Sequence, residues 1–262
     1  MGKGKEASVK EYKEEYIIDF RDVDRDYHVK LPQLLEVLGT VSTKHTDALG
    51  IDPYYLQRRN MAWVLYDWRV EMEETELYAT LVKIRTFAVD RRGMYFIRYF
   101  GLYTPEGVRI GRGFSRWVVI DLKNRKITRV PKEILKVFED GNEGKTQEQL
   151  WIMGVSDKDF CPIDHSLKEG QKIFDVRYYD VDANHHVNNV KYVDWAIESL
   201  YSEGDFLSEH CVNAASIVYK KEKGPEGRVV AKYLLGKDRS HHEIYSEEGE
   251  LLTVLDLEWK KK

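Results

Sequence analysis

Cysteine is scarce in this 262-residue sequence, where Cys161 and Cys211 are the only two and neither lies in a Cys-x-x-Cys pair. Two such cysteines are too few for a disulfide-stabilised scaffold. The sequence also lacks an apolar run near the roughly 20 residues that a membrane-spanning helix needs. Its charged start, Met1–Ala7, contains no apolar segment typical of a secretory signal. We therefore expect a cytoplasmic protein that does not span a membrane.

An excess of positive charge is absent as well. The 41 lysines and arginines face 45 aspartates and glutamates, which leaves a net charge of −4 at pH 7. Proteins that bind nucleic acids electrostatically usually carry a basic excess, so we expect no nucleic-acid partner. Hydrophobic residues at 42% and aromatic residues at 12% supply enough apolar mass for a packed core. The length fits one large domain or two small ones.

An internal repeat favours two domains. Residues 22–29 read Asp-Val-Asp-Arg-Asp-Tyr-His-Val, and residues 180–187 read Asp-Val-Asp-Ala-Asn-His-His-Val. The segments share five of eight residues at an offset of 158 positions, and a sixth position exchanges Asp26 for Asn184. A repeat of this kind indicates a duplicated structural unit.

Similar patterns surround the two copies. Apolar residues recur at helical spacing over 34–49, with Pro32 suited to a first helical turn, and again over 190–200, with Asn188 or Asn189 as candidate N-cap. Alternating apolar residues and turn residues predict strands in both halves. These predicted strands lie at 62–70, 77–89, 94–103, 111–121 and 126–130, and at 172–179, 212–222, 228–236, 241–246 and 251–259.

Each half therefore resembles a lead strand, one main helix and several antiparallel strands, which is an α+β arrangement. The stretch 139–165 between the halves is polar and irregular in pattern, and we interpret it as a linker. The predicted domains are residues 1–138 and 166–262.

The Asp-x-Asx-x-His motif allows three interpretations. Calcium binding would place Asp180, Asp182 and Asn184 at positions 1, 3 and 5 of an EF-hand-like loop, but Lys191 then stands where a bidentate glutamate is required. A structural role is also open, because short Asp/Asn clusters before helices form turns and caps. We prefer that role for 22–28, beside which the sequence nominates no second functional group.

The third interpretation is catalytic. Asp182, Asn184 and His186 lie in one loop that leads into the predicted helix at 190–200. The start of a helix offers unpaired backbone N–H groups and the positive end of the helix dipole. These features stabilise a developing oxyanion, so the loop is suited to acyl transfer or hydrolysis.

The second copy and its surroundings resemble a known family. The stretch 182–192, Asp-Ala-Asn-His-His-Val-Asn-Asn-Val-Lys-Tyr, is followed by Trp195 and by Glu198-Ser199. This pattern is similar to the signature of acyl-acyl-carrier-protein thioesterases, which are tandem hotdog enzymes of bacteria and plant plastids. The resemblance extends in order through the first half, at Trp63-Val64, Val70-Glu71, 116–119 (Arg-Trp-Val-Val) and 127–134 (Ile-Thr-Arg-Val-Pro-Lys-Glu-Ile).

The resemblance implies a role for each matching residue. Asp182, Asn184 and His186 match the family's catalytic loop, and Glu222 matches an acidic catalytic residue on a strand of the second hotdog. The plant enzymes have a cysteine after that glutamate, whereas this chain has Lys223. A cysteine nucleophile is therefore not expected. We expect water activated by a carboxylate, with Glu222 as general base or, second, as a nucleophile, and Asp182 as the other candidate base.

The resemblance also implies a fatty acyl chain bound by the first hotdog and an acyl carrier protein as partner. Candidates to line the acyl tunnel are Trp63, Trp68, Phe96 and Phe100, which also fit an ordinary core. Acyl carrier proteins are acidic, so docking calls for a basic patch. The candidate patches are Arg91-Arg92, Lys123–Lys126, Lys220-Lys221 with Lys223, and Lys260–Lys262. A homodimer is a further expectation, since hotdog proteins commonly pair.

Neither a metal ion nor a cofactor is expected. The pairs His185-His186 and His241-His242 are adjacent in sequence, so on a strand their members point to opposite faces, and no His-Glu-x-x-His motif accompanies them. Alternative functions are acyl-CoA hydrolysis, hydration or dehydration by a hotdog hydratase, and non-catalytic acyl binding. The hydratase motif differs by a proline after the asparagine and a histidine one place further on, which favours hydrolysis here.

Overall fold

The computed structural model describes residues 11–91, 93–138, 146–155 and 167–262. Cys161, Arg92 and most of the predicted linker lie outside these ranges. The chain forms two compact units. The first comprises residues 1–17, 37–66 and 80–156, and the second comprises 18–36, 67–79 and 157–262. Both copies of the repeated motif therefore belong to the second unit.

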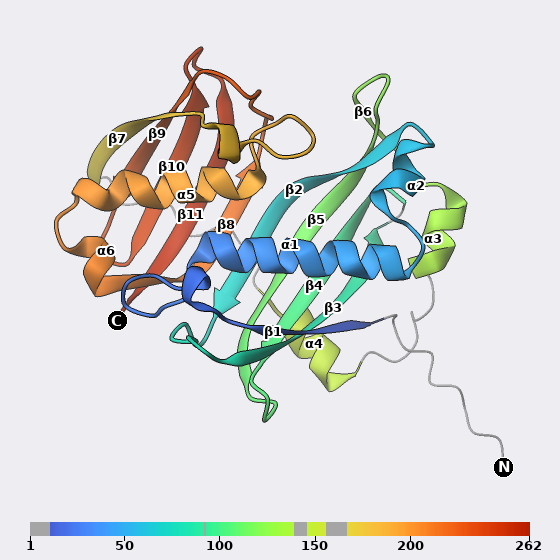
Figure 1. Cartoon of the computed structure of the whole chain (residues 1–262), viewed down its shortest axis with the longest axis horizontal. Helices are drawn as coiled ribbons and strands as arrows, with labels where there is room; N and C mark the ends of the chain where they lie inside the picture. The colour runs from blue at the N-terminus through green and yellow to red at the C-terminus, as the bar shows by residue number, and fades with distance from the viewer. Residues whose placement is uncertain (1–10, 92, 139–145, 156–166) are drawn as a thin grey trace. The chain divides into compact units, whose positions relative to one another are not determined.

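The first unit is an antiparallel sheet in the strand order β1-β3-β4-β5, with β6 paired to β5. Figure 1 shows α1 (Leu31–Ala48) running across these strands, and His45 Nδ1 of α1 lies 2.7 Å from Arg98 Nη1 of β4. The other elements are β1 (Tyr12–Ile17), α2 (Pro53–Gln57), the first half of β2 (Met61–Met72), β3 (Leu81–Arg91), β4 (Tyr95–Tyr103), β5 (Arg109–Asp121), β6 (Lys126–Thr128), α3 (Lys132–Phe138) and α4 (Gln147–Met153).

The second unit is an antiparallel sheet in the order β8-β11-β10-β9-β7, with residues 67–71 of β2 paired to β8. The helix α5 (Asn189–Ser199) contacts β7, β9, β10 and β11, so it covers one face of the sheet (Figure 1). The other elements are the 3-10 turns η1 (Phe20–Asp22), η2 (Tyr178–Asp180) and η3 (Leu200–Ser202), the helix α6 (Phe206–Glu209), and the strands β7 (Lys168–Asp175), β8 (His210–Tyr219), β9 (Arg228–Leu235), β10 (Arg239–Ser246) and β11 (Leu251–Lys261).

The two predicted helices are confirmed as α1 and α5. Pro32 lies in the first turn of α1, and the side chain of Asn188 caps α5 by accepting the Val190 N–H at 3.2 Å. Three strand predictions were wrong by about three residues or more at an end. The strand predicted from residue 77 begins at Leu81, because Ala79 adopts a left-handed φ of 56°. The strand predicted at 172–179 forms at Lys168–Asp175, because the chain then turns into η2. The strand predicted at 212–222 ends at Tyr219, so Glu222 lies after β8 and not on a strand as the resemblance implied.

The prediction that residues 139–165 are irregular throughout was wrong. Residues Gln147–Met153 form α4, which contacts β4 and β5 of the first unit. Thr146 and Gln149 form a capping box, in which each side chain accepts the backbone N–H of the other residue. In the described residues no helix is long and apolar enough to cross a bilayer.

The aromatic residues proposed for an acyl tunnel are largely buried. Phe96 and Phe100 lie inside the first unit, and Trp68 lies inside the second. Trp63 is partly buried and packs edge-to-face on Phe96, with 5.4 Å between the ring centroids. Their role in binding an acyl chain stays a prediction.

Candidate active site

The loop before α5 is organised by the Asp182 carboxylate. Asp182 Oδ1 accepts the backbone N–H groups of Asn184 at 2.8 Å and His186 at 3.4 Å, and the Asp182 N–H donates to His186 O at 2.8 Å. His185 completes the turn in a left-handed conformation with φ of 60°. Asp182 therefore fixes the backbone of the loop, as short Asp/Asn clusters before helices commonly do.

The segment after β8 lies beside this loop. The Val187 N–H donates to Lys223 O at 2.9 Å, which places the residue before Lys223 next to the motif histidine. Glu222 Oε2 lies 3.6 Å from His186 Nε2. The two side chains are 42% and 32% exposed, so solvent and a substrate can reach them. The structure thus brings together all four predicted site residues, Asp182, Asn184, His186 and Glu222, although it assigns no chemistry to them.

Most backbone N–H groups at the start of α5 are already bonded. The N–H groups of residues 184–186 donate within the loop, those of Val187 and Asn188 donate to carbonyl oxygens, and those of Val190 and Lys191 donate to Asn188. Within the described stretch 184–191, the Asn189 N–H is the one without such a partner. Of the several N–H groups expected to stabilise an oxyanion, the Asn189 N–H is therefore the candidate in this stretch.

Tyr192 lies behind the pair of His186 and Glu222. Its side chain is 1% exposed, and its hydroxyl accepts the Lys223 backbone N–H at 3.1 Å. Burial raises the pKa of Tyr192 to about 12, and the negative charges of Glu222 and Asp182 add to this rise. The tyrosine was predicted only as part of the family signature. No local pattern could link it to Lys223, because the contact depends on how the chain continues after β8.

The first copy of the motif folds in the same way. Asp24 Oδ1 accepts the N–H groups of Asp26 at 2.9 Å and His28 at 3.0 Å, and the Asp24 N–H donates to His28 O at 2.8 Å. Tyr27 has the left-handed φ of 66° that His185 has in the second copy. Asp24 therefore has the turn-forming role predicted for this segment.

The structure corrects the expectation that the first copy has no second functional group beside it. The Val29 N–H donates to Thr75 O at 2.8 Å, as the Val187 N–H does to Lys223 O. Glu74, the residue before Thr75, is thus the structural counterpart of Glu222. The offset between these glutamates is 148 rather than 158 positions, so a fixed-offset search of the sequence misses the correspondence.

The polar groups of the first copy are bonded to their own neighbours. Glu74 Oε1 accepts the N–H groups of Thr75 at 2.7 Å and Glu76 at 2.9 Å, and these bonds, that of Glu76 first, lower the pKa of Glu74. His28 Nδ1 lies 2.9 Å from Thr75 Oγ1. Lys262 Nζ pairs with Asp24 Oδ2 at 2.8 Å and with Asp26 Oδ2 at 2.6 Å.

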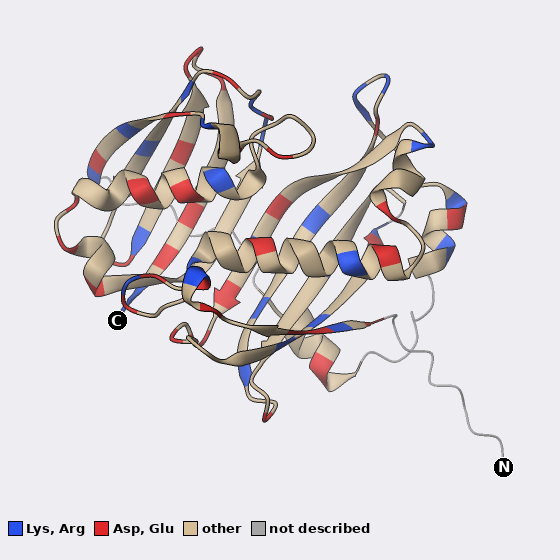
Figure 2. Ribbon diagram, in the orientation of Figure 1, with Lys and Arg blue, Asp and Glu red and all other residues tan. Residues whose placement is uncertain are grey.

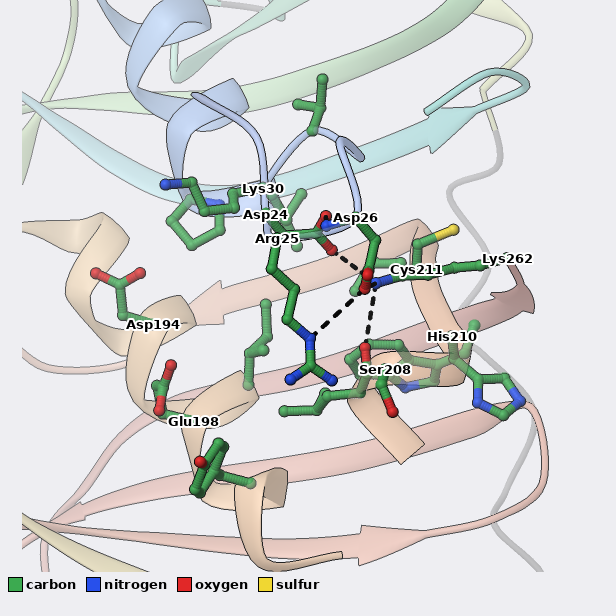
Figure 3. A pocket seen from close by; sticks show the side chains of 18 of the residues that line it. Asp24, Arg25, Asp26, Lys30, Asp194, Glu198, Ser208, His210, Cys211 and Lys262 are labelled. Carbon is green, nitrogen blue, oxygen red and sulfur yellow. Dashed lines mark hydrogen bonds and ion pairs between the residues drawn. The ribbon is translucent and has the colours of Figure 1, made fainter. Parts of the chain in front are cut away.

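A cavity of about 580 Å³ lies beside the first copy, within the second unit. Figure 3 shows Asp24 and Asp26 turned toward Lys262 at its wall, with Asp194 and Glu198 of α5 opposite. Its lining carries charges of both signs, so its electrostatics indicate no particular class of ligand. In the part of the chain that the structure describes, no three His, Cys, Asp or Glu side chains are grouped so as to hold a metal ion.

The fold and the site define a class of protein: a tandem α+β hotdog chain in which a histidine of the loop before α5 lies beside a carboxylate of the segment after β8. The model of the acyl-ACP thioesterase N-terminal domain matches residues 9–138, and that of the C-terminal domain matches residues 164–261. The chain belongs to the acyl-ACP thioesterase family.

Solved structures confirm the predicted α+β hotdog fold. A putative oleoyl thioesterase from Lactobacillus plantarum superposes with a TM-score of 0.81 at 21% identity, covering 97% of this chain and 98% of that one. The 12:0-ACP thioesterase from Umbellularia californica gives 0.78 at 18% identity, covering 96% and 98%.

Curated relatives are plant proteins. A chloroplastic acyl-[acyl-carrier-protein] hydrolase of Cuphea viscosissima is 25% identical over 82% of this chain and 53% of its own length. The chloroplastic oleoyl-acyl carrier protein thioesterase 2 of Arabidopsis thaliana is 23% identical over 80% of this chain and 59% of its own length. The chain thus spans little more than half the length of these relatives.

Proposed function

We propose that this chain hydrolyses the thioester of fatty acyl-acyl carrier protein to free fatty acid and carrier protein. Membership of the acyl-ACP thioesterase family and the names of the relatives support this activity. The observation that carries it is the 3.6 Å approach of His186 Nε2 to Glu222 Oε2 at a solvent-accessible loop before α5. A carboxylate and an imidazole at this separation can both contact one water molecule.

In the proposed reaction, Glu222 takes a proton from water, and the water oxygen attacks the thioester carbonyl carbon. His186 and Asn184 orient the water and the carbonyl, while Asp182 holds the loop. The Asn189 N–H stabilises the oxyanion of the tetrahedral intermediate. The carbon–sulfur bond then breaks, and the thiolate of the carrier's pantetheine arm leaves and takes up the proton.

A cysteine nucleophile fits the chain poorly. Cys211 is buried, and its Sγ lies 3.4 Å from Thr75 Oγ1, beside the first copy of the motif rather than the second. Cys161 lies outside the described residues. We therefore assign the attack to water, with residues 1–138 binding the acyl chain and 166–262 supplying the chemistry.

For the carrier protein we propose docking on the basic segment that brackets Glu222. Lys220 and Lys221 are exposed, and Lys223 is partly exposed. Lys221 pairs with Glu250 there, just as Lys262 of the Lys260–Lys262 patch pairs with Asp24 and Asp26, so the preference rests on nearness to Glu222. The turn at Lys123–Lys126, blue at the β5–β6 connection in Figure 2, is exposed but belongs to the first unit. We also propose a cytoplasmic location and a homodimer, without nucleic-acid or membrane partners.

The deciding experiment offers the purified protein acyl-carrier-protein thioesters of several chain lengths, the matching acyl-CoA thioesters and an enoyl thioester. Release of thiol and free fatty acid from the carrier-protein substrates supports the proposal, and E222A serves as the inactive control. Faster hydrolysis of acyl-CoA would replace the proposed substrate. Hydration of the enoyl group without thiol release would indicate a hydratase, and binding without turnover would indicate an acyl-binding protein.

A further inference from the structure

In the two copies of the motif, an equivalent backbone N–H group is paired with different acceptors. In each copy the chain bends after a glutamate, and the next backbone N–H needs an acceptor because leaving it unpaired costs free energy. In the first copy, the Thr75 N–H donates to the carboxylate of Glu74, at 2.7 Å. In the second copy, the Lys223 N–H donates to the Tyr192 hydroxyl, at 3.1 Å.

The difference follows from one residue on each helix. Tyr192 lies in the first turns of α5, and the residue at the same offset of 158 positions in α1 is Leu34. Both side chains are buried, at 1% and 3% exposure, but leucine has no oxygen to accept an N–H. With no hydroxyl available, the glutamate of the first copy folds back and caps its own backbone at Thr75 and Glu76.

We infer that Tyr192 is a positioning residue: by accepting the Lys223 N–H, its hydroxyl keeps that N–H from drawing the Glu222 carboxylate away from His186. This inference rests on the proposed function and deepens it. Leu34 then accounts for the different orientation of Glu74, although Glu74 lies beside the same kind of loop.

The packing around Tyr192 holds the hydroxyl in place. Its ring meets Trp195 edge-on at 5.6 Å and Tyr219 at 6.1 Å between centroids. The Tyr219 hydroxyl in turn donates to Asn189 O at 3.3 Å, which ties the same cluster to the start of α5. A ring packed on two aromatic neighbours has little freedom to move, so the position of its hydroxyl is defined.

The test compares Y192F with the wild type and with Y233F. The phenylalanine keeps the packed ring and removes only the acceptor. Tyr233 is a matched control, because it is also buried and its hydroxyl also has a partner, Glu203, away from the motif loop. We expect kcat of Y192F to fall about tenfold with KM changed by less than about twofold, as for loss of one hydrogen bond. Y233F should keep wild-type kcat.

Two further readouts separate positioning from general damage. A backbone N–H that loses its acceptor seeks another one nearby. In Y192F, the Glu222 carboxylate should therefore turn toward the Lys223 N–H, and the carboxyl 13C chemical shift of Glu222 at neutral pH, assigned with E222Q, should change. In the E222Q background, Y192F should cause no further loss of residual activity, because Tyr192 acts through Glu222.

Each result has a defined meaning. An unchanged carboxyl 13C chemical shift of Glu222, or an equal loss of activity from Y192F with and without E222Q, would overturn the inference. The 13C measurement needs no substrate, so it tests Tyr192 even if the wild-type protein hydrolyses no thioester and the proposed function fails. Thermal unfolding of Y192F and Y233F checks that both remain folded.

Discussion

The two motif loops of the second unit have nearly the same backbone and different surroundings. Asp24 and Asp182 each close their loop by accepting two backbone N–H groups, and Tyr27 and His185 each turn it with a left-handed φ. The aspartate at this position is therefore first a fold-forming residue. The repetition of this loop in the chain therefore indicates a shared turn and does not by itself indicate catalysis.

The side chains around the loops make the difference. In the first copy, Lys262 pairs with both Asp24 and Asp26. In the second copy, the Asn184 amide donates to Asp182 Oδ2 at 3.2 Å, so the loop satisfies this oxygen without a lysine. The second loop is consequently closed by neutral local groups, and its histidine faces a glutamate. The comparison shows that two loops with nearly the same backbone can place their histidine beside different side chains, and we expect this difference to decide which loop takes part in hydrolysis.

The matched histidines give the largest expected contrast. H186A should lower kcat by about 100-fold or more, since a group that orients water and carbonyl in general base catalysis contributes on this scale. H28A should keep kcat within about twofold, because His28 bonds to Thr75 and contacts no proposed substrate position. Steady-state thiol release from an acyl-carrier-protein thioester measures both. Equal losses would mean that the two loops share the chemistry.

Replacing Asn184 by aspartate, the residue type at the matching position Asp26 of the first copy, should lower kcat less than H186A does. N184D places a second carboxylate beside Asp182 and removes the amide donor to Asp182 Oδ2. Like charges at this distance repel, so we expect kcat to fall about tenfold and the loop to loosen. D26N in the first copy should leave kcat unchanged. Hydrogen exchange of residues 180–187 in N184D, together with kcat, checks this prediction; an unaltered loop would contradict it.

Acid should weaken the first loop through its ion pairs. The hydrogen bond from Lys262 holds the pKa of Asp26 below its ordinary value of 3.8, against a small opposing effect of burial. Since the folded-state pKa is lowered, this stabilisation is fully present above pH 3.8 and is lost as pH falls through the lower folded value. K262A should remove this contribution and cost about 1 kcal/mol, since the two carboxylates stay partly exposed although the Lys262 side chain is 11% exposed.

Urea unfolding of K262A and wild type between pH 2.5 and about pH 6 measures this difference, which should shrink toward the acid end. K220A, which changes a lysine next to Glu222 at the other loop, is the control for a general change of charge. A difference in the free energy of unfolding between wild type and K262A that grows as the pH falls would contradict the role given to the ion pairs of Lys262.

The sequence alone predicted a substantial part of the fold. The duplication, both main helices and most strands follow from local periodicity and from turn residues, since Gly107, Gly227 and Gly249 adopt left-handed φ values in the turns before β5, β9 and β11. Several strand ends were predicted wrongly. The start of β3 is one of them, because Ala79 is held by a bond between distant segments, from the Ala79 N–H to Ile18 O. The helix α4 could have been found from Thr146 and Gln149, which form a capping box.

The candidate site was predictable where residues lie in one motif or match a family pattern. The structure brings Asp182, Asn184, His186 and Glu222 together, and their chemical roles stay predictions. The contacts of Tyr192 and Lys262, and the place of Glu74 beside the first loop, could not be predicted, because each depends on tertiary pairing between segments far apart in sequence. No local pattern reports that a tyrosine hydroxyl takes a distant backbone N–H.

The central claim is that only the glutamate of the second copy serves hydrolysis, and the matched variants E222Q and E74Q test it most directly. Each replaces a carboxylate by an amide of nearly equal size beside the same kind of loop. Single-turnover thiol release from an acyl-carrier-protein thioester should slow by about 100-fold or more in E222Q and stay within about twofold of wild type in E74Q. Wild-type turnover in E222Q, or an equal loss in both variants, would contradict the account.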